Sequence, residues 1–171
     1  LCTISVQPRG VSTELCGYMG VPTIEGSGVL MKIVALSLAT GGPGMGKAAY
    51  SSGTPALGVG AGNVPAYIER SADIEDAVAK IFSSKTFDNG TVCASEQSIV
   101  TESVIADKVR SAVIANGGYF LEGEKLEQVK RVMERGNGSM NPAIVGRDAP
   151  YHPHLAGLTV PPGTRLLVSG E

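Results

Sequence analysis

The sequence predicts an α/β fold with a parallel sheet. The apolar run IVALSLA, at residues 33–39, predicts a strand buried on both faces. A helix from Pro43 or Gly44 to Ser52 and a further strand within residues 55–69 follow it, which makes a βαβ unit. The composition is that of a globular chain: 43% of the 171 residues are hydrophobic and 18% are charged, which suits one domain or parts of two.

Glycine and proline punctuate the first part of the chain. No period holds over residues 1–22, whereas residues 23–32 predict a weak helix that two glycines interrupt. Proline near the first turn and Gly53 just beyond the end bound the helix that follows the first strand. Residues 55–69 predict a strand, a glycine turn and another strand.

The rest of the chain alternates helices with short strands. Asp73 predicts the cap of a helix that runs to about Lys85 and has one apolar face, formed by Ile74, Ala77, Val78 and Ile81. Further helices are predicted over residues 103–118, which end on Asn-Gly-Gly, and over residues 122–138. Short strands are predicted at residues 98–102, 143–146 and 165–170.

Charge and cysteine content exclude several classes of protein. A net charge of −2 gives no attraction to nucleic acid or to an anionic membrane, and no apolar run reaches the ~20 residues of a membrane span. The chain starts without a secretory signal, and Cys2, Cys16 and Cys93 form no CxxC pair, so we expect a reducing, cytoplasmic setting. Because the chain begins with Leu and ends on a predicted strand, we expect a piece of a larger protein.

The two histidines lie in the segment YHPH at residues 151–154. This segment predicts an exposed loop, and two histidines are too few for a metal site. No metal is therefore expected.

A glycine-rich motif, TGGPGMGK at residues 40–47, follows the first predicted strand. Its spacing is close to that of the phosphate-binding loop of nucleotide hydrolases. However, Ala48 stands where that loop needs the Ser or Thr that holds magnesium, and Pro43 removes one backbone N–H. One alternative is a turn that binds nothing. Another is a metal-free cradle in which N–H groups at the helix start bind a dinucleotide pyrophosphate.

A cysteine motif, SKTFDNGTVCASEQS at residues 84–98, is the second candidate site. One alternative is a buried, inert cysteine, which is the commonest kind. Against it, the neighbours of Cys93 are small and polar, and Asp88-Asn89-Gly90 demands an unusual backbone of the kind that positions functional groups. A cysteine–histidine hydrolase is a further alternative, although no histidine lies nearby in the sequence.

Residues 84–98 and the stretch ATGGPGMGKAAYSSGTPALGVGAGNVPAYIE, at residues 39–69, together resemble the CoA-acylating branch of the aldehyde dehydrogenase superfamily. The resemblance is to the acetaldehyde and propionaldehyde dehydrogenases of bacterial microcompartments, and to the aldehyde dehydrogenase half of bifunctional aldehyde–alcohol dehydrogenases. It implies the aldehyde dehydrogenase α/β fold. Residues 1–62 would be the C-terminal part of a Rossmann-like NAD-binding domain, and residues 63–171 the N-terminal part of the catalytic domain.

The resemblance also implies a site and a reaction. Cys93 matches the nucleophile, TGGPG the turn that approaches the NAD phosphates, and GVGAGN the stretch beside the nicotinamide. The implied cofactor-binding residues are Thr40, Gly41, Gly42, Gly44, Val59, Gly60 and Ala61. The implied reaction oxidises acetaldehyde or propionaldehyde with NAD (or NADP) and CoA to an acyl-CoA, through a thioester at Cys93. The enzyme would be a homo-oligomer of the cytoplasm or of a microcompartment, and this chain alone an inactive fragment.

One departure from the wider superfamily favours the acylating branch. Hydrolytic relatives carry a glutamate base where Val59 aligns, and no carboxylate occurs between Gly41 and Ile68. Water needs a base to attack a thioester, whereas a thiol supplies some thiolate unaided. Two other departures concern packing: Gly46 replaces a bulky aliphatic residue, and Lys32 meets Ile33 directly where relatives have a few more residues.

Overall fold

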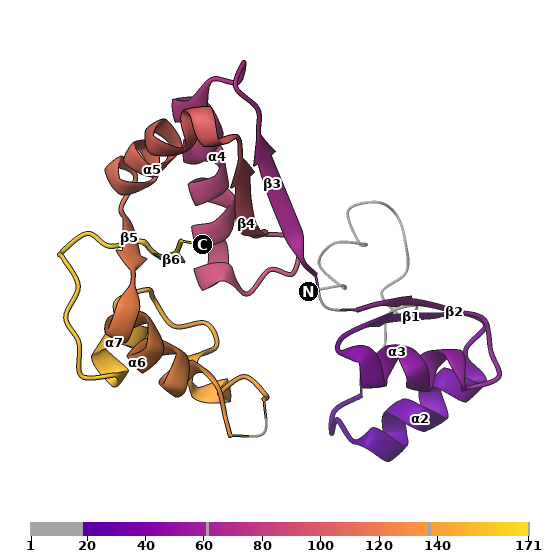
Figure 1. Ribbon diagram of the computed structural model, residues 1–171. Helices are drawn as coiled ribbons and strands as arrows, with labels where there is room; N and C mark the ends of the chain where they lie inside the picture. The colour runs from indigo at the N-terminus through magenta and orange to yellow at the C-terminus, as the bar shows by residue number, and fades with distance from the viewer. Residues whose placement is uncertain (1–18, 61, 137, 171) are drawn as a thin grey trace, which may run out of the picture. The chain divides into compact units, whose positions relative to one another are not determined.

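The computed structural model describes residues 19–60, 62–136 and 138–170. The chain divides into two compact units, Leu1–Ala61 and Gly62–Glu171, which can be followed in Figure 1. Both contain helices packed on pairs of parallel strands, which confirms the predicted α/β fold class. The division falls between residues 61 and 62, and the assignment of the two parts to an NAD-binding and a catalytic domain stays a prediction.

The first unit is a parallel strand pair with helices on one side. β1 (Ser37–Thr40) pairs with β2 (Ala56–Val59), and α3 (Pro43–Tyr50) connects them, so the predicted βαβ unit is confirmed. α2 (Ile24–Ile33) precedes β1, and Figure 1 shows α2 and α3 on the same side of the strands. Thr23 caps the start of α2, because its hydroxyl accepts the N–H of Gly26 at 2.9 Å.

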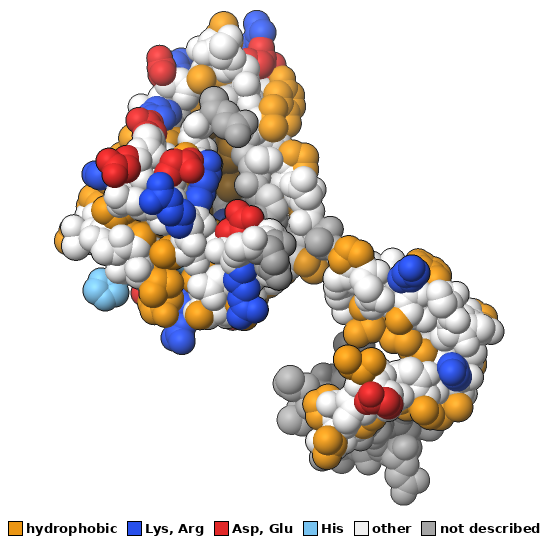
Figure 2. Space-filling model, turned by 60° about the horizontal axis from the view of Figure 1, so that its bottom comes forward, with side chains coloured by type: hydrophobic (Ala, Val, Ile, Leu, Met, Phe, Trp, Pro, Cys, Tyr) orange, Lys and Arg blue, Asp and Glu red, His pale blue; other side chains and the backbone are white. Residues whose placement is uncertain are grey.

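The strand predicted over residues 33–39 is shorter and more exposed than expected. Ile33 ends α2, and β1 begins only at Ser37. Along β1 the side chains alternate, because Ala39 is buried under the helices whereas Leu38 is 75% exposed. Burial on both faces is therefore wrong for the described residues, since both helices cover the same face. Figure 2 shows further hydrophobic side chains on the helical side of this unit, where Ile24 of α2 is 88% exposed.

The second unit contains two more parallel strand pairs among the described residues. β3 (Val64–Ile68) pairs with β4 (Glu96–Thr101), and β5 (Gly118–Leu121) pairs with β6 (Leu166–Ser169). The strands predicted within residues 55–69, at 98–102 and at 165–170 are thereby confirmed, with ends that shift by a residue or two.

Two helices form the core of the second unit with these strands. α4 (Ile74–Thr86) begins as predicted at Asp73, whose carboxylate accepts the N–H of Asp76 at 3.1 Å. α4 and α5 (Ala106–Ala115) bury a cluster that consists of Ile68, Val78, Ile81, Phe82, Ile105, Val109, Ala112 and Val113. The predicted apolar face of α4 belongs to this core, with Ile74 and Ala77 packed at its margin. The last predicted helix is also present, as α6 (Gly123–Met133).

Three segments differ from the sequence-based expectation. The strand predicted at residues 143–146 is a 3-10 turn, η5 (Pro142–Ile144), because the side chain of Asn141 caps the turn by accepting the N–H of Ala143 at 3.1 Å. YHPH is not an exposed loop but most of a short helix, α7 (Tyr151–Leu155), in which Pro153 is buried. β5 was not foreseen, because its pairing partner, β6, lies far along the chain. Across the described ranges, no helix has both the length and the apolar character needed to cross a membrane.

Candidate active site

Cys93 lies in a loop of the second unit whose start has an unusual backbone. The loop leaves α4 through η3 (Phe87–Gly90), where Asp88 and Asn89 both have a φ of 49° and Gly90 has a φ of 73°. Residues other than glycine rarely adopt this left-handed backbone conformation, and among them asparagine and aspartate do so most readily. The prediction that Asp-Asn-Gly demands an unusual backbone is therefore confirmed.

Hydrogen bonds hold this turn on two sides. The side-chain amide of Asn89 donates to the carbonyl of Gly146 at 2.8 Å, which ties the turn to the segment after η5. The hydroxyl of Thr91 reaches both the carbonyl of Asp88, at 2.9 Å, and its carboxylate, at 2.5 Å. The carboxylate of Asp88, within the turn, thus accepts a hydrogen bond from the hydroxyl of Thr91.

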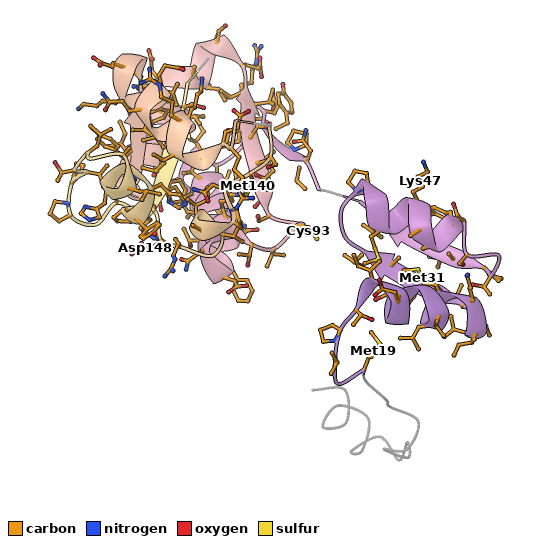
Figure 3. The ribbon with its side chains drawn as sticks, turned by 90° about the horizontal axis from the view of Figure 1, so that it is seen from below. Met19, Met31, Lys47, Cys93, Met140 and Asp148 are labelled. Carbon is orange, nitrogen blue, oxygen red and sulfur yellow. The ribbon has the colours of Figure 1, made fainter. Side chains whose placement is uncertain are left out.

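Cys93 itself is a free, exposed cysteine, and Figure 3 shows it at the surface of its unit. The alternative of a buried cysteine is therefore wrong. Within the described ranges, its backbone N–H donates no hydrogen bond to a protein acceptor. Thiol and N–H are both available to a small molecule.

Gly62 packs directly against this loop. A Cβ on Gly62 would lie 3.0 Å from the carbonyl carbon of Cys93, and closer still to the carbonyl oxygen, so only glycine fits. Gly62 was not among the predicted site residues, although its place in the GVGAGN motif was a signal that could have found it. The structure brings the end of that motif to the cysteine loop.

Lys85, in the last turn of α4, is a cation beside the loop. Its ammonium donates to the side-chain carbonyl of Gln97 at 3.0 Å and to the hydroxyl of Ser95 at 3.4 Å. Partial burial lowers the pKa of Lys85, and attraction to the Glu96 carboxylate opposes that change. One carboxylate oxygen of Glu96, Oε2, is buried with no hydrogen-bond partner among the described residues.

In the first unit, the glycine turn lies at the carboxyl ends of β1 and β2. Thr40 is level with Val59 in the parallel register, and the N–H of Gly41 donates to the carbonyl of Val59 at 3.2 Å. Gly60, which follows Val59, is exposed. Four of the predicted cofactor residues therefore meet at one edge of the strand pair, and Ala61 lies outside the described residues.

The start of α3 offers hydrogen-bond donors and open space. Gly42 is the N-cap residue, and in the described part of the chain the N–H groups of Gly42 and Gly44 have no protein acceptor. A Cβ at either position would meet no atom within 4 Å. Free N–H groups at a helix start attract phosphate, so the turn fits a dinucleotide pyrophosphate.

The glycine turn has fewer of the features that a nucleotide hydrolase needs than of those that a pyrophosphate cradle needs. Lys47, which would have to reach the phosphates, extends from α3 into solvent in Figure 3. Ala48 lacks the hydroxyl that would hold magnesium. In the ranges that the structure describes, no three His, Cys, Asp or Glu side chains gather in a group that could bind a metal ion.

Comparison with known proteins identifies relatives. No protein-family model matches the chain. It is 50% identical over 161 residues to the bifunctional aldehyde-alcohol dehydrogenase AdhE of Escherichia coli K12, and the match covers 93% of this chain and 18% of that protein. The acetylating aldehyde dehydrogenase of Geobacillus thermoglucosidasius matches with a TM-score of 0.89 and 43% identity, covering 99% of this chain and 38% of the solved one. The homologues of this chain are acylating aldehyde dehydrogenases.

This homology confirms the resemblance that the two motifs predict. A third acylating relative is the propionaldehyde dehydrogenase of Rhodopseudomonas palustris, solved with bound CoA and an acylated cysteine. It matches with a TM-score of 0.79 and 30% identity, over 86% of this chain and 34% of the solved one. The chain therefore spans less than a fifth of the bifunctional relative and between a third and two fifths of the two solved acylating enzymes.

Proposed function

We propose that the protein containing this chain is an NAD-dependent, CoA-acylating aldehyde dehydrogenase. It oxidises a short-chain aldehyde, acetaldehyde or propionaldehyde, and transfers the acyl group to CoA. The observation that carries the proposal is the exposed thiol of Cys93 on a fixed turn, in a chain with an acylating relative that was solved with an acylated cysteine. The protein works as a homo-oligomer in the cytoplasm or in a bacterial microcompartment.

Cys93 is the nucleophile of this mechanism. Its thiolate attacks the aldehyde carbon, which forms a C–S bond and an oxyanion, and its backbone N–H donates a hydrogen bond to that oxyanion. NAD, when bound, supplies the acceptor for the hydride that leaves the same carbon, so that a thioester remains. The thiolate of CoA then attacks the thioester, the bond to Cys93 breaks, and Cys93 leaves as a thiolate.

The glycine turn of the first unit holds the pyrophosphate of the cofactor. Gly42 and Gly44 donate their free N–H groups, and Thr40 and Gly41 shape the turn. Val59 and Gly60 follow at the end of the neighbouring strand, and Ala61 comes next in the sequence. NADP carries the same pyrophosphate, so this turn accepts either cofactor.

The choice of CoA over water as acceptor rests on the segment that carries the base in hydrolytic relatives, because this segment has no carboxylate here. No carboxylate occurs in the sequence between Gly41 and Ile68, and Val59 stands at the position of the hydrolytic glutamate. In the cysteine loop, the carboxylate of Asp88 already accepts a hydrogen bond from Thr91. A thiol does not need such a base, because part of it is ionised near neutral pH.

The test is to replace the nucleophile in the full-length protein. Cys93→Ala is expected to abolish acyl-CoA formation, measured by chromatography of the CoA products. Cys16→Ala, at one of the two cysteines outside both motifs, serves as control and retains the parent rate. Acyl-CoA formation by Cys93→Ala at the rate of the control would refute the proposal.

The identity to AdhE favours one version of this function, in which the chain belongs to the aldehyde dehydrogenase half of a bifunctional enzyme. A bifunctional protein reduces acyl-CoA to the alcohol with NADH, whereas a single aldehyde dehydrogenase stops at the aldehyde. Product analysis of the full-length protein distinguishes the two.

A further inference from the structure

We infer that Lys85 is a positioning residue that holds the loop carrying Cys93. The inference rests on the proposed function, in which Cys93 is the nucleophile. Lys85 lies in the last turn of α4, just before the left-handed turn, and its ammonium donates to two side chains that follow Cys93: Gln97 at 3.0 Å and Ser95 at 3.4 Å.

Lys85 also contacts the loop on the other side of Cys93. A Cβ placed on Gly90 would lie 3.3 Å from the carbonyl oxygen of Lys85 and 3.5 Å from its ammonium nitrogen. The ammonium therefore lies near Gly90, before the cysteine, and is bonded to Ser95 of the loop and to Gln97 at the start of β4, after the cysteine.

Ser95 transmits this contact to the turn that carries the thiol. Ser95 is 1% exposed, and its N–H and its hydroxyl both donate to the carbonyl of Val92, at 3.1 and 2.8 Å. An ammonium can only donate, so the hydroxyl accepts from Lys85 and directs its own proton to Val92. These bonds close the turn over residues 92–95, in which Cys93 lies.

The hydrogen-bond partners of Lys85 lie in the cysteine loop, at Ser95, and at the start of β4, at Gln97. Its acceptors are a neutral amide and a neutral hydroxyl, and among the described residues it forms no ion pair. Partial burial also lowers its pKa, which is the cost of holding a charge away from water. A lysine whose ammonium pointed into solvent would not bear that cost.

Lys80 provides a matched control on the same helix. Its side chain is 75% exposed and pairs with Asp76 at 2.5 Å, one turn earlier on α4. Replacing Lys80 with methionine removes the same charge and leaves the cysteine loop untouched.

The test measures hydrogen exchange of the Ser95 amide in the full-length protein, because this N–H closes the cysteine turn. Lys85→Met is expected to exchange about tenfold faster than the parent, and Lys80→Met at the parent rate. Gln97→Leu removes the acceptor of the shorter bond at an exposed position and is expected to accelerate exchange by about threefold. It therefore decides the question should Lys85→Met fail to fold.

Steady-state kinetics distinguish a positioning role from a merely structural one, because a merely structural lysine would not change kcat at constant KM. Lys85→Met is expected to lower kcat for acyl-CoA formation by about tenfold to a hundredfold at an unchanged KM for the aldehyde, because the nucleophile is misplaced while the substrate pocket is kept. Ser95 exchange at the parent rate in folded Lys85→Met, or in Gln97→Leu, overturns the inference. So does an equal loss of kcat in Lys80→Met. Exchange needs no substrate, so it tests Lys85 even where Cys93→Ala refutes the proposed reaction.

Discussion

Replacing Gly62 with alanine tests whether the cysteine loop depends on a close backbone contact. The new Cβ would lie 3.0 Å from the carbonyl carbon of Cys93, 3.6 Å from its Cα, and too close to its carbonyl oxygen for any side-chain atom. These are backbone atoms that cannot rotate away, so the two segments must separate by on the order of 1 Å. A displacement of that size at a nucleophile costs about 100-fold in rate. The strain also lowers the free energy of unfolding by about 1–3 kcal/mol.

Acyl-CoA formation and thermal unfolding of the full-length protein measure these two effects. Gly136→Ala is the control, because Gly136 lies in the same unit, is exposed, and has no atom within 4 Å of an added Cβ. We expect Gly62→Ala to be slow and less stable, and Gly136→Ala to match the parent in both assays. The reasoning is refuted by a Gly62→Ala protein with the rate and the Tm of the control. The change in Tm tests the contact even without catalysis.

Three further predictions concern stability. Gly46→Ala raises the free energy of unfolding by about 0.5–1 kcal/mol in urea denaturation, because Gly46 lies inside α3 and an added Cβ meets no atom within 4 Å; a loss of stability would contradict this. Gly118→Ala lowers it by about 1–3 kcal/mol, because the Cβ would lie 2.5 Å from Cγ1 of Val113 and 2.8 Å from its carbonyl oxygen; an unchanged urea midpoint would contradict the contact. The guanidinium of Arg70, whose Nε lies 2.7 Å from Oε2 of Glu102, holds the pKa of that carboxyl below its usual value. This stabilisation is present above the ordinary glutamate pKa and is lost as the pH falls through the lowered folded value. In Arg70→Ala, an NMR titration is expected to return the pKa of Glu102 towards the ordinary value, and a pKa that stays low would exclude Arg70 as the cause.

The elements that the sequence predicts well are those with local causes. α4 follows from the cap at Asp73 and an apolar period along one face. The βαβ unit follows from an apolar run, a proline at the helix start and Gly53, whose φ of 87° is the left-handed ending that glycine favours. The errors have non-local causes, because β5 forms only where β6 pairs with it and the exposure of Leu38 depends on which layers cover the strands.

The site divides in the same way. The motifs predict Cys93 and the glycine turn as site residues. The exposure of Cys93 supports the first assignment, and the open space at the start of α3 supports the second. Gly62 and Lys85 were missed, although both stand inside or beside the quoted motifs. The motifs contain both residues, but the sequence does not show the contact with the cysteine loop through which each acts.

By itself, the sequence determined that an unusual backbone precedes Cys93, which the structure shows to be a left-handed turn. Asp-Asn-Gly is among the few tripeptides that occupy such a backbone at low cost, and this preference is local. Only the tertiary structure decided what holds the loop: the carbonyl of Gly146, the bare Cα of Gly62 and the ammonium of Lys85. The physical reason is that hydrogen bonds and close contacts act through space, between segments whose approach depends on how the helices and strands of the unit pack.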